Sequence, residues 1–186
     1  MTERAKVEGL WGASWAEPIR IHIDRDYRIS RALVPGHFGN RGFLEMPLRR
    51  YIAGDGALLH EIVHIYAPNA NRFLAEGLAT YLHARLGGNA AFPNYGKNLS
   101  DLARDELPFV SSLAPLNGVR TPTPLESVMN ERIAYILAGS FVGFLIEREG
   151  LPVFRKLYEA GDYLSTFGRD LAELEKEWRA SLQGAR

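Results

Sequence analysis

Two histidines and a glutamate with metal-ligand spacing stand near the middle of the sequence. Residues 60–64 read His-Glu-Ile-Val-His, an HExxH pattern, and eleven residues separate His64 from Glu76. Side chains four residues apart on a helix lie on one face, so His60 and His64 can offer two imidazole nitrogens to one metal ion. Catalytic zinc sites combine histidine nitrogens with a carboxylate and leave a position for water. Glu61 adjoins the first ligand and is suited to act as the general base of a zinc-dependent hydrolase.

A helix must present this pentad on one of its faces. Asp55-Gly56 offers a helix start ahead of it, and Pro68 ends the segment after Tyr66. The apolar residues recur at helical spacing and would bury one side of the helix: Leu59, Ile62, Val63 and Tyr66. The alternative is an amphipathic helix that merely carries two histidines on its surface.

A second helix is predicted to bring the third ligand. Asn71 can cap a helix that runs from Arg72 to Leu86 and ends before two glycines. Glu76 lies one turn inside it, among apolar residues, where a carboxylate needs a partner or a metal. The short turn at 68–71 predicts that this helix returns antiparallel to the first, with Glu76 facing the two histidines. The alternative is an exposed acid near a helix N-terminus.

The segments HEIVH and FLAEGLATYL together resemble the gluzincin zinc peptidases, the group that contains thermolysin-like and aminopeptidase-like enzymes. The resemblance implies that His60, His64 and Glu76 bind zinc and that Glu61 is the base. It covers mainly residues 58–82, and more weakly 131–182.

The residues near the pentad and near Glu76 differ from the sequence patterns of two related groups of zinc peptidases. The metzincin pattern HExxHxxGxxH fails, because Ala67 and Ala70 occupy its later positions. Thermolysin-like enzymes carry an aspartate four residues after the glutamate ligand, where this chain has Thr80. The phrase EGLATY is closer to the aminopeptidase-like enzymes, although the gap between His64 and the glutamate is shorter here.

The resemblance also implies a substrate-binding strand. In gluzincin-like folds a small sheet precedes the active-site helix, and its edge strand binds the substrate backbone. Residues 42–46 are the candidate, with Phe43, Leu44 and Glu45 as substrate-binding residues, because an edge strand can recognise an extended peptide by strand addition. Glu45 is also the candidate anchor for a substrate amine. The alternative is an ordinary strand of the sheet.

A hydrogen-bond donor for the oxyanion is expected from the C-terminal helices of such a fold. Tyr135 is the candidate catalytic donor, and His83 is the second choice. The alternative for Tyr135 is a core aromatic residue whose hydroxyl finds a local partner.

The patterning predicts an α+β fold. Residues 19–24 alternate as a half-buried strand does, 31–34 and 43–46 are two further short strands, and together they predict a small antiparallel or mixed sheet. Helices are predicted over 131–149, from Pro152 onward and over 171–182. We expect a single zincin-like metallopeptidase domain, with a β-rich N-terminal lobe over 1–50 and a helical lobe over 51–186.

Composition excludes several classes of protein. Lysines and arginines together number 22, as do the acidic residues, so there is no basic footprint for nucleic acid. The absence of cysteine excludes disulfides and thiolate metal sites. No long apolar run predicts a signal peptide or a membrane span, so a cytoplasmic protein is expected.

The sequence therefore predicts a zinc-dependent peptidase that hydrolyses peptide bonds with a water activated by Glu61. The expected cofactor is Zn²⁺ and the expected partner is a peptide or protein substrate. One alternative is a non-catalytic, zinc-containing domain that binds peptides or proteins. Glu61 argues against it, because zinc binding alone does not require this residue. A second alternative is a helical protein without metal.

Overall fold

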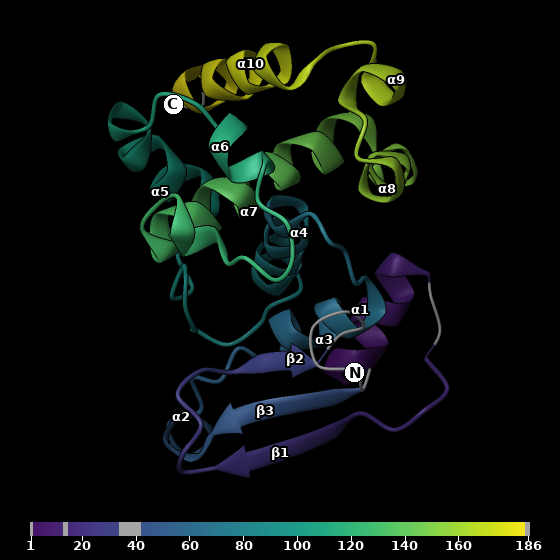
Figure 1. Cartoon of the computed structure of the whole chain (residues 1–186), viewed down its shortest axis with the longest axis vertical. Coiled ribbons are helices and arrows are strands. Elements are labelled where there is room, and N and C mark those ends of the chain that lie inside the picture. The colour runs from purple at the N-terminus through teal and green to yellow at the C-terminus, as the bar shows by residue number, and fades with distance from the viewer. Residues whose placement is uncertain (1, 13–14, 34–41, 185–186) are drawn as a thin grey trace. The chain divides into compact units, whose positions relative to one another are not determined.

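A computed structural model describes residues 2–12, 15–33 and 42–184 (Figure 1). The chain forms two compact units, one of Met1–Pro68 with Leu82–Gly96 and one of Asn69–Tyr81 with Lys97–Arg186. A three-stranded mixed sheet precedes a mostly helical region, which confirms the predicted α+β class. The predicted division into lobes at residue 50 stays a prediction.

The sheet of the first unit consists of β1 (Arg20–Asp24), β2 (Arg31–Leu33) and β3 (Phe43–Pro47). Its order is β1-β3-β2, with β1 parallel and β2 antiparallel to β3. The strand predicted over 43–46 is therefore present, but the prediction that it lies at an edge is wrong. Both sides of β3 already hold a neighbouring strand, so its backbone has no free ladder for a substrate peptide. The edge position was an implication of the gluzincin resemblance, and the local sequence of a strand does not indicate its place in the sheet.

Three helices complete the main elements of the first unit: α1 (Glu3–Trp11), α2 (Leu48–Ala53) and α3 (Leu58–Tyr66). Helix α1 packs against α3 and buries Val7 and Trp11. Leu44 and Met46 of β3 are buried in the same unit, as is almost all of α3. The pentad helix is thus a core element of this unit.

The start of α3 differs from the prediction. Its N-cap is Ala57, and no side chain caps it, so the predicted cap at Asp55 is wrong. Instead, Asn89 donates from Nδ2 to the carbonyl oxygens of Gly54 (2.5 Å) and Gly56 (2.9 Å). A Cβ on Gly56 would lie 2.8 Å from Met46, so the loop approaches β3 too closely for a side chain.

The second unit is built around α7 (Glu131–Glu149), the long helix predicted over the same residues. It contacts α5 (Leu99–Glu106), α8 (Leu151–Ala160) and α10 (Leu171–Gly184). Trp178 of α10 is fully buried and donates from Nε1 to Ser140 Oγ at 3.1 Å. The shorter elements are α6 (Ala114–Asn117), α9 (Tyr163–Phe167) and the 3₁₀ turns η1 (Leu107–Phe109) and η2 (Leu125–Ser127). Among the described helices, none combines the length and apolarity needed to cross a membrane.

Helix α4 (Arg72–Arg85) begins in the second unit and ends in the first. Glycines allow it to pack closely against α7. A Cβ on Gly77 would lie 2.7 Å from the backbone oxygen of Ala138, and a Cβ on Gly139 would lie 2.7 Å from Thr80 Cγ2. Because these approaches leave no room for a methyl group, they fix the position of α4 against α7.

Candidate metal centre

The two histidines of the pentad face each other inside the protein. His60 and His64 are 5% and 9% exposed, and their Nε2 atoms lie 3.2 Å apart. The ring centroids are 4.9 Å apart and the rings are inclined at 76°. Both imidazoles therefore direct the same nitrogen towards a common point, as the i, i+4 spacing predicted.

This separation fits a shared metal ion. Two nitrogens bound at about 2.0–2.1 Å to a tetrahedral zinc ion lie about 3.3 Å from each other. The observed 3.2 Å is close to that value.

Glu76 completes a group of three possible ligands. It is 2% exposed, and the ligand atoms of His60, His64 and Glu76 all lie within 4.8 Å of one another. Two imidazoles and a carboxylate are a donor set that zinc accepts, and other first-row metals accept it as well. The predicted grouping of these three residues is confirmed as a buried cluster that could hold a metal ion.

Arg72 forms an ion pair with Glu76 one helical turn away. Its Nη2 donates to Oε1 of the carboxylate, and the arginine side chain is 23% exposed. A buried carboxylate is costly unless it is paired, so Arg72 stabilises the ionised form that a metal requires. A carboxylate has two oxygens and about four acceptor positions, so this contact is compatible with a metal ligand. We did not predict this pair from the sequence, although an i, i+4 arginine was the available signal.

Backbone contacts fix the start of α4 within the second unit. Asn71 Oδ1 accepts from Leu74 N at 3.2 Å, which confirms the predicted asparagine cap. Arg72 N donates to Val119 O at 3.1 Å, and Thr121 N donates to Ala70 O at 2.9 Å. The segment 119–121 therefore holds the start of α4, which carries Arg72 and, one turn later, Glu76.

Two tyrosines lie within electrostatic reach of Glu76. Burial raises the pKa of Tyr135 and of Tyr158 well above the usual range, and the charge of Glu76 raises both further, while Arg72 acts in the opposite direction. Both phenols therefore keep their protons at neutral pH and can act as hydrogen-bond donors. The role of Tyr135 as a catalytic donor stays a prediction. Nothing in the sequence distinguished Tyr158 from other core tyrosines.

A polar contact attaches α1 to the end of α3. Tyr66 lies two residues after His64, and its hydroxyl donates to Glu8 Oε1 at 2.5 Å. Arg4 Nε donates to the same carboxylate oxygen at 3.1 Å. Burial and the bond to Glu8 raise the pKa of Tyr66 to about 12. The hydrogen-bonded chain from Arg4 to Tyr66 therefore helps to hold the pentad helix against α1.

His83 has a structural contact of its own. It is 2% exposed, and its Nε2 lies 2.8 Å from Asn89 O. Burial lowers the pKa of His83, so the neutral ring is favoured and donates to that carbonyl. A Cβ on Gly88 would lie 2.5 Å from the ring, so the turn after α4 packs against His83 too closely for a side chain at residue 88.

The three proposed substrate-binding residues occupy the central strand. Leu44 is fully buried, and Glu45 forms an ion pair with Arg31 of β2. The ring of Phe43 lies beneath the guanidinium of Arg20, 5.4 Å from the ring centroid. That these side chains bind substrate stays a prediction.

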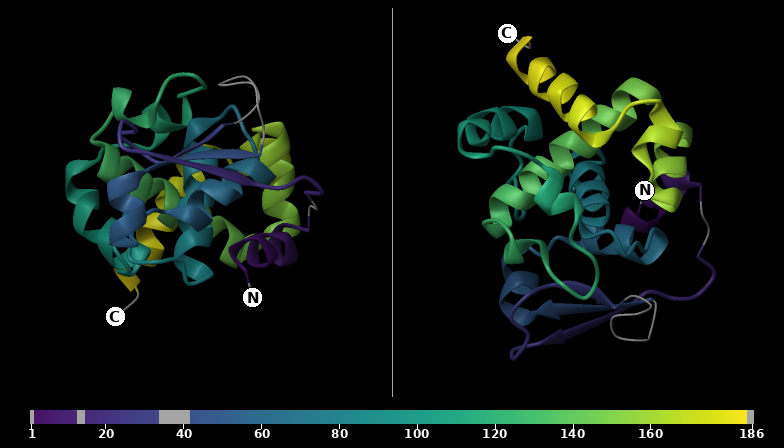
Figure 2. Two further views of the ribbon diagram at one scale, coloured as in Figure 1. Left: turned by 90° about the horizontal axis from the view of Figure 1, so that it is seen from below. Right: turned by 45° about the horizontal axis from the view of Figure 1, so that its top comes forward.

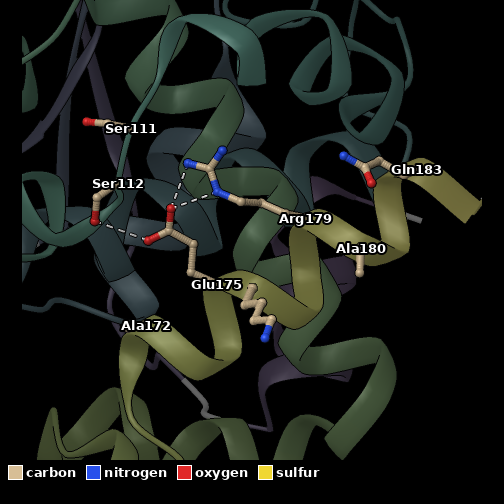
Figure 3. Close-up of a pocket in the computed structure, with 8 residues that line it drawn as sticks. Ser111, Ser112, Ala172, Glu175, Arg179, Ala180 and Gln183 are labelled. Atoms are coloured by element: carbon tan, nitrogen blue, oxygen red, sulfur yellow. Dashed lines mark hydrogen bonds and ion pairs between the residues drawn. The ribbon is translucent and has the colours of Figure 1, made fainter.

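A separate pocket of about 480 Å³ lies in the second unit and contains none of the predicted site residues (Figure 3). Glu175 stands at its centre, where it accepts from Leu113 N at 2.9 Å and from Arg179 Nη2 at 2.7 Å. Arg179 also donates to Val110 O at 2.8 Å. These polar groups form hydrogen bonds with one another, so we interpret them as contacts that hold α10 in place and not as a ligand site. The lining consists of Ser111, Ser112, Ala172, Glu175, Lys176, Arg179, Ala180 and Gln183.

In comparisons with known proteins, no family model, curated protein or solved structure matches the chain.

Proposed function

We propose that the chain is a zinc-dependent peptidase with His60, His64 and Glu76 as metal ligands. The observation that carries the proposal is the 3.2 Å separation of the two Nε2 atoms, in a cluster with the Glu76 carboxylate. A buried cluster of two histidines and a glutamate fits the zinc donor set. Zinc, when bound, supplies a Lewis acid that lowers the pKa of a bound water towards about 7.

Glu61 is the residue that favours catalysis over simple metal binding. It is 7% exposed and directly follows the ligand His60 on α3. In this proposal Glu61 takes the proton of the attacking water and passes it to the leaving amine. A metal site without chemistry would not need a second acid at this position.

Tyr135 is proposed to stabilise the oxyanion that develops on the substrate carbonyl. Its protonated phenol and its closeness to Glu76 support this role. A preorganised donor acts most strongly in a buried site, where water does not compete for the oxyanion. Tyr158, which the charge of Glu76 affects in the same way, is the second candidate.

Substrate binding by strand addition is proposed for β2 rather than β3. Strand β2 contacts α3 and pairs on one side with β3, and no described segment pairs with its other side. An extended peptide added to β2 would gain backbone hydrogen bonds beside the pentad helix.

The test compares wild type with Glu61→Gln for zinc content and for cleavage of a mixed peptide library. We expect about one zinc per chain in both proteins and a loss of cleavage of about 10²–10⁴-fold in the variant. Zinc in both without cleavage in either would favour the alternative, a zinc-containing domain that binds peptides or proteins. Cleavage that does not depend on Glu61 would contradict the proposed mechanism.

A further inference from the structure

Strand β1 forms an outer edge of the sheet (Figure 2, right). All five of its residues are exposed. Within the described ranges, it pairs only with β3. Edge strands are commonly protected by charged side chains, proline or a bulge. Arg20–Asp24 contains no lysine or proline, and its two charged residues stand at its two ends. Ile21 and Ile23 are 41% and 38% exposed, so this edge presents apolar side chains to solvent.

The outward hydrogen-bonding groups of β1 belong to these two isoleucines. Arg20 N donates to Gly42 O at 2.9 Å, so the amide of Arg20 points towards β3. Backbone direction alternates along a strand. The amide and carbonyl groups of Ile21 and Ile23 therefore point away from the sheet, where another strand can pair with them.

The sequence of the strand is complementary to itself. It reads Arg-Ile-His-Ile-Asp, with a cation at one end, an anion at the other and histidine in the middle. We propose that β1 pairs antiparallel with β1 of a second copy, about a two-fold axis at His22. Arg20 then lies opposite Asp24 of the second copy, and Ile21 lies opposite Ile23. A two-fold interface requires such self-complementarity, because each residue must suit its counterpart in the other copy.

Hydrogen bonding agrees with this register. Ile21 and Ile23 have outward amides and carbonyls, so they form the hydrogen-bonded pairs of the new ladder. Arg20, His22 and Asp24 form the non-hydrogen-bonded pairs, in which opposing Cα atoms are only about 4.5 Å apart and side chains approach closely. The two opposite-charge pairs thus take the positions where opposing side chains lie closest to each other. Asp24 Oδ1 accepts from Asp26 N at 2.9 Å, and the second oxygen of the carboxylate can accept from arginine.

The apolar surface around β1 also supports pairing with a second copy of the chain. Ile21 and Ile23 stand beside the buried Leu44 and Met46 in the sheet register, so pairing between copies extends an existing apolar face. Helix α2 also contacts β1, and its Tyr51 and Ile52 are 59% and 75% exposed. A second copy paired through β1 leaves β2, at the opposite edge, open for a substrate peptide.

Site-specific cross-linking tests the register. The chain has no cysteine, so His22→Cys introduces a single thiol at an exposed position. At the two-fold axis, Cβ atoms of opposing residues lie about 4.5–5.5 Å apart, close to the spacing that a disulfide needs. We expect mild oxidation to convert His22→Cys into a covalent dimer. The control Ile21→Cys places its thiols diagonally, about 7–8 Å apart, and should remain uncross-linked. Equal cross-linking at both positions, or none at His22→Cys, would overturn the proposed register.

Charge reversal tests the pairing in sedimentation experiments. Wild type should show a monomer–dimer equilibrium, and Arg20→Asp or Asp24→Arg alone should weaken it by at least about tenfold, because each places like charges opposite one another. Mixing the two single variants should restore dimers, since each cation then meets an anion. The double variant Arg20→Asp/Asp24→Arg should also dimerise. A wild type that stays monomeric up to its solubility limit, or single variants that mixing does not rescue, would overturn the proposal. Neither outcome bears on zinc binding or peptide cleavage.

Discussion

The guanidinium of Arg72 donates to the carboxylate of Glu76, one turn along the same helix, inside a cluster that also contains two histidines. The pair gives the buried carboxylate a cationic partner before any metal arrives. A bound metal ion would give the carboxylate a second cationic partner. Arg72 should therefore contribute more to the stability of the metal-free protein than to the stability of the metal-bound protein.

Arg72→Met should therefore destabilise the metal-free protein by about 1–3 kcal/mol, because it leaves the buried Glu76 carboxylate without its arginine. Saturating zinc should raise the melting temperature of Arg72→Met more than that of wild type, since the ion replaces the lost positive charge. Thermal unfolding with chelator and with zinc measures both effects. Arg85→Met, at an exposed position of the same helix, is the control and should behave like wild type. An equal zinc-induced rise in all three proteins would contradict this account of the pair.

Tyr135→Phe should lower kcat by about 10²–10³-fold with little change in KM, if Tyr135 donates to the oxyanion. Zinc content should be unchanged, because the phenol is not among the three ligands. Steady-state kinetics on a cleaved library peptide would measure the effect. Tyr158→Phe serves as the comparison, because Tyr158 also lies within reach of Glu76. A large loss in Tyr158→Phe, with none in Tyr135→Phe, would transfer the donor role to Tyr158.

The contact of Tyr66 with Glu8 predicts a loss of stability at alkaline pH. The pKa of Tyr66 rises from its usual value of 10 to about 12 in the folded protein. The folded state therefore keeps the proton more tightly than the unfolded chain does. Stability from this group is fully present below pH 10 and is lost as the pH rises from 10 to about 12.

Tyr66→Phe should flatten the decline in unfolding free energy over this window, and it should also lower stability at neutral pH because the bond to Glu8 is lost. Urea unfolding at a series of pH values gives both quantities. Tyr51→Phe, at a 59% exposed position, is the matched control. A parallel decline in the unfolding free energies of wild type and Tyr66→Phe between pH 10 and 12 would contradict this prediction.

Gly77→Ala should destabilise the protein by about 1–3 kcal/mol, because the added methyl would lie 2.7 Å from the backbone oxygen of Ala138. It should also weaken zinc binding, since Gly77 adjoins the ligand Glu76. Gly9→Ala is the control, and its expected effect on stability has the opposite sign. No atom lies within 4 Å of a Cβ at that helical position, so alanine should stabilise α1 by up to about 1 kcal/mol. Denaturant unfolding and a competitive zinc titration measure the two effects, and a neutral Gly77→Ala would refute the close packing of α4 on α7.

The sequence predicted those parts of the site whose geometry is local. The spacing of His60 and His64 was sufficient to bring two nitrogens together, and Asn71 capped the helix that carries Glu76 as expected. Short-range periodicity also located the long helix over 131–149. Each of these features depends on residues that lie within about one helical turn of one another or on a sustained apolar pattern.

The features that the sequence did not predict depend on distant residues. Helix α1 has only Val7 and Trp11 buried, and its polar partner Tyr66 lies 58 residues from Glu8. The central position of β3 depends on which strands join it from either side, information that alternation does not contain. In the same way, no local pattern could indicate that Tyr158 approaches Glu76.

Zinc binding by the three proposed ligands can be tested directly. Native mass spectrometry of the purified protein, after reconstitution and removal of excess metal, counts the ions per chain. We predict one zinc per chain in wild type and in Glu61→Gln, and a loss of bound zinc in His64→Ala and Glu76→Ala, with His22→Ala unaffected. A wild type that binds no zinc, or a His64→Ala variant that binds it as tightly as wild type, would contradict the assignment of His60, His64 and Glu76 as zinc ligands.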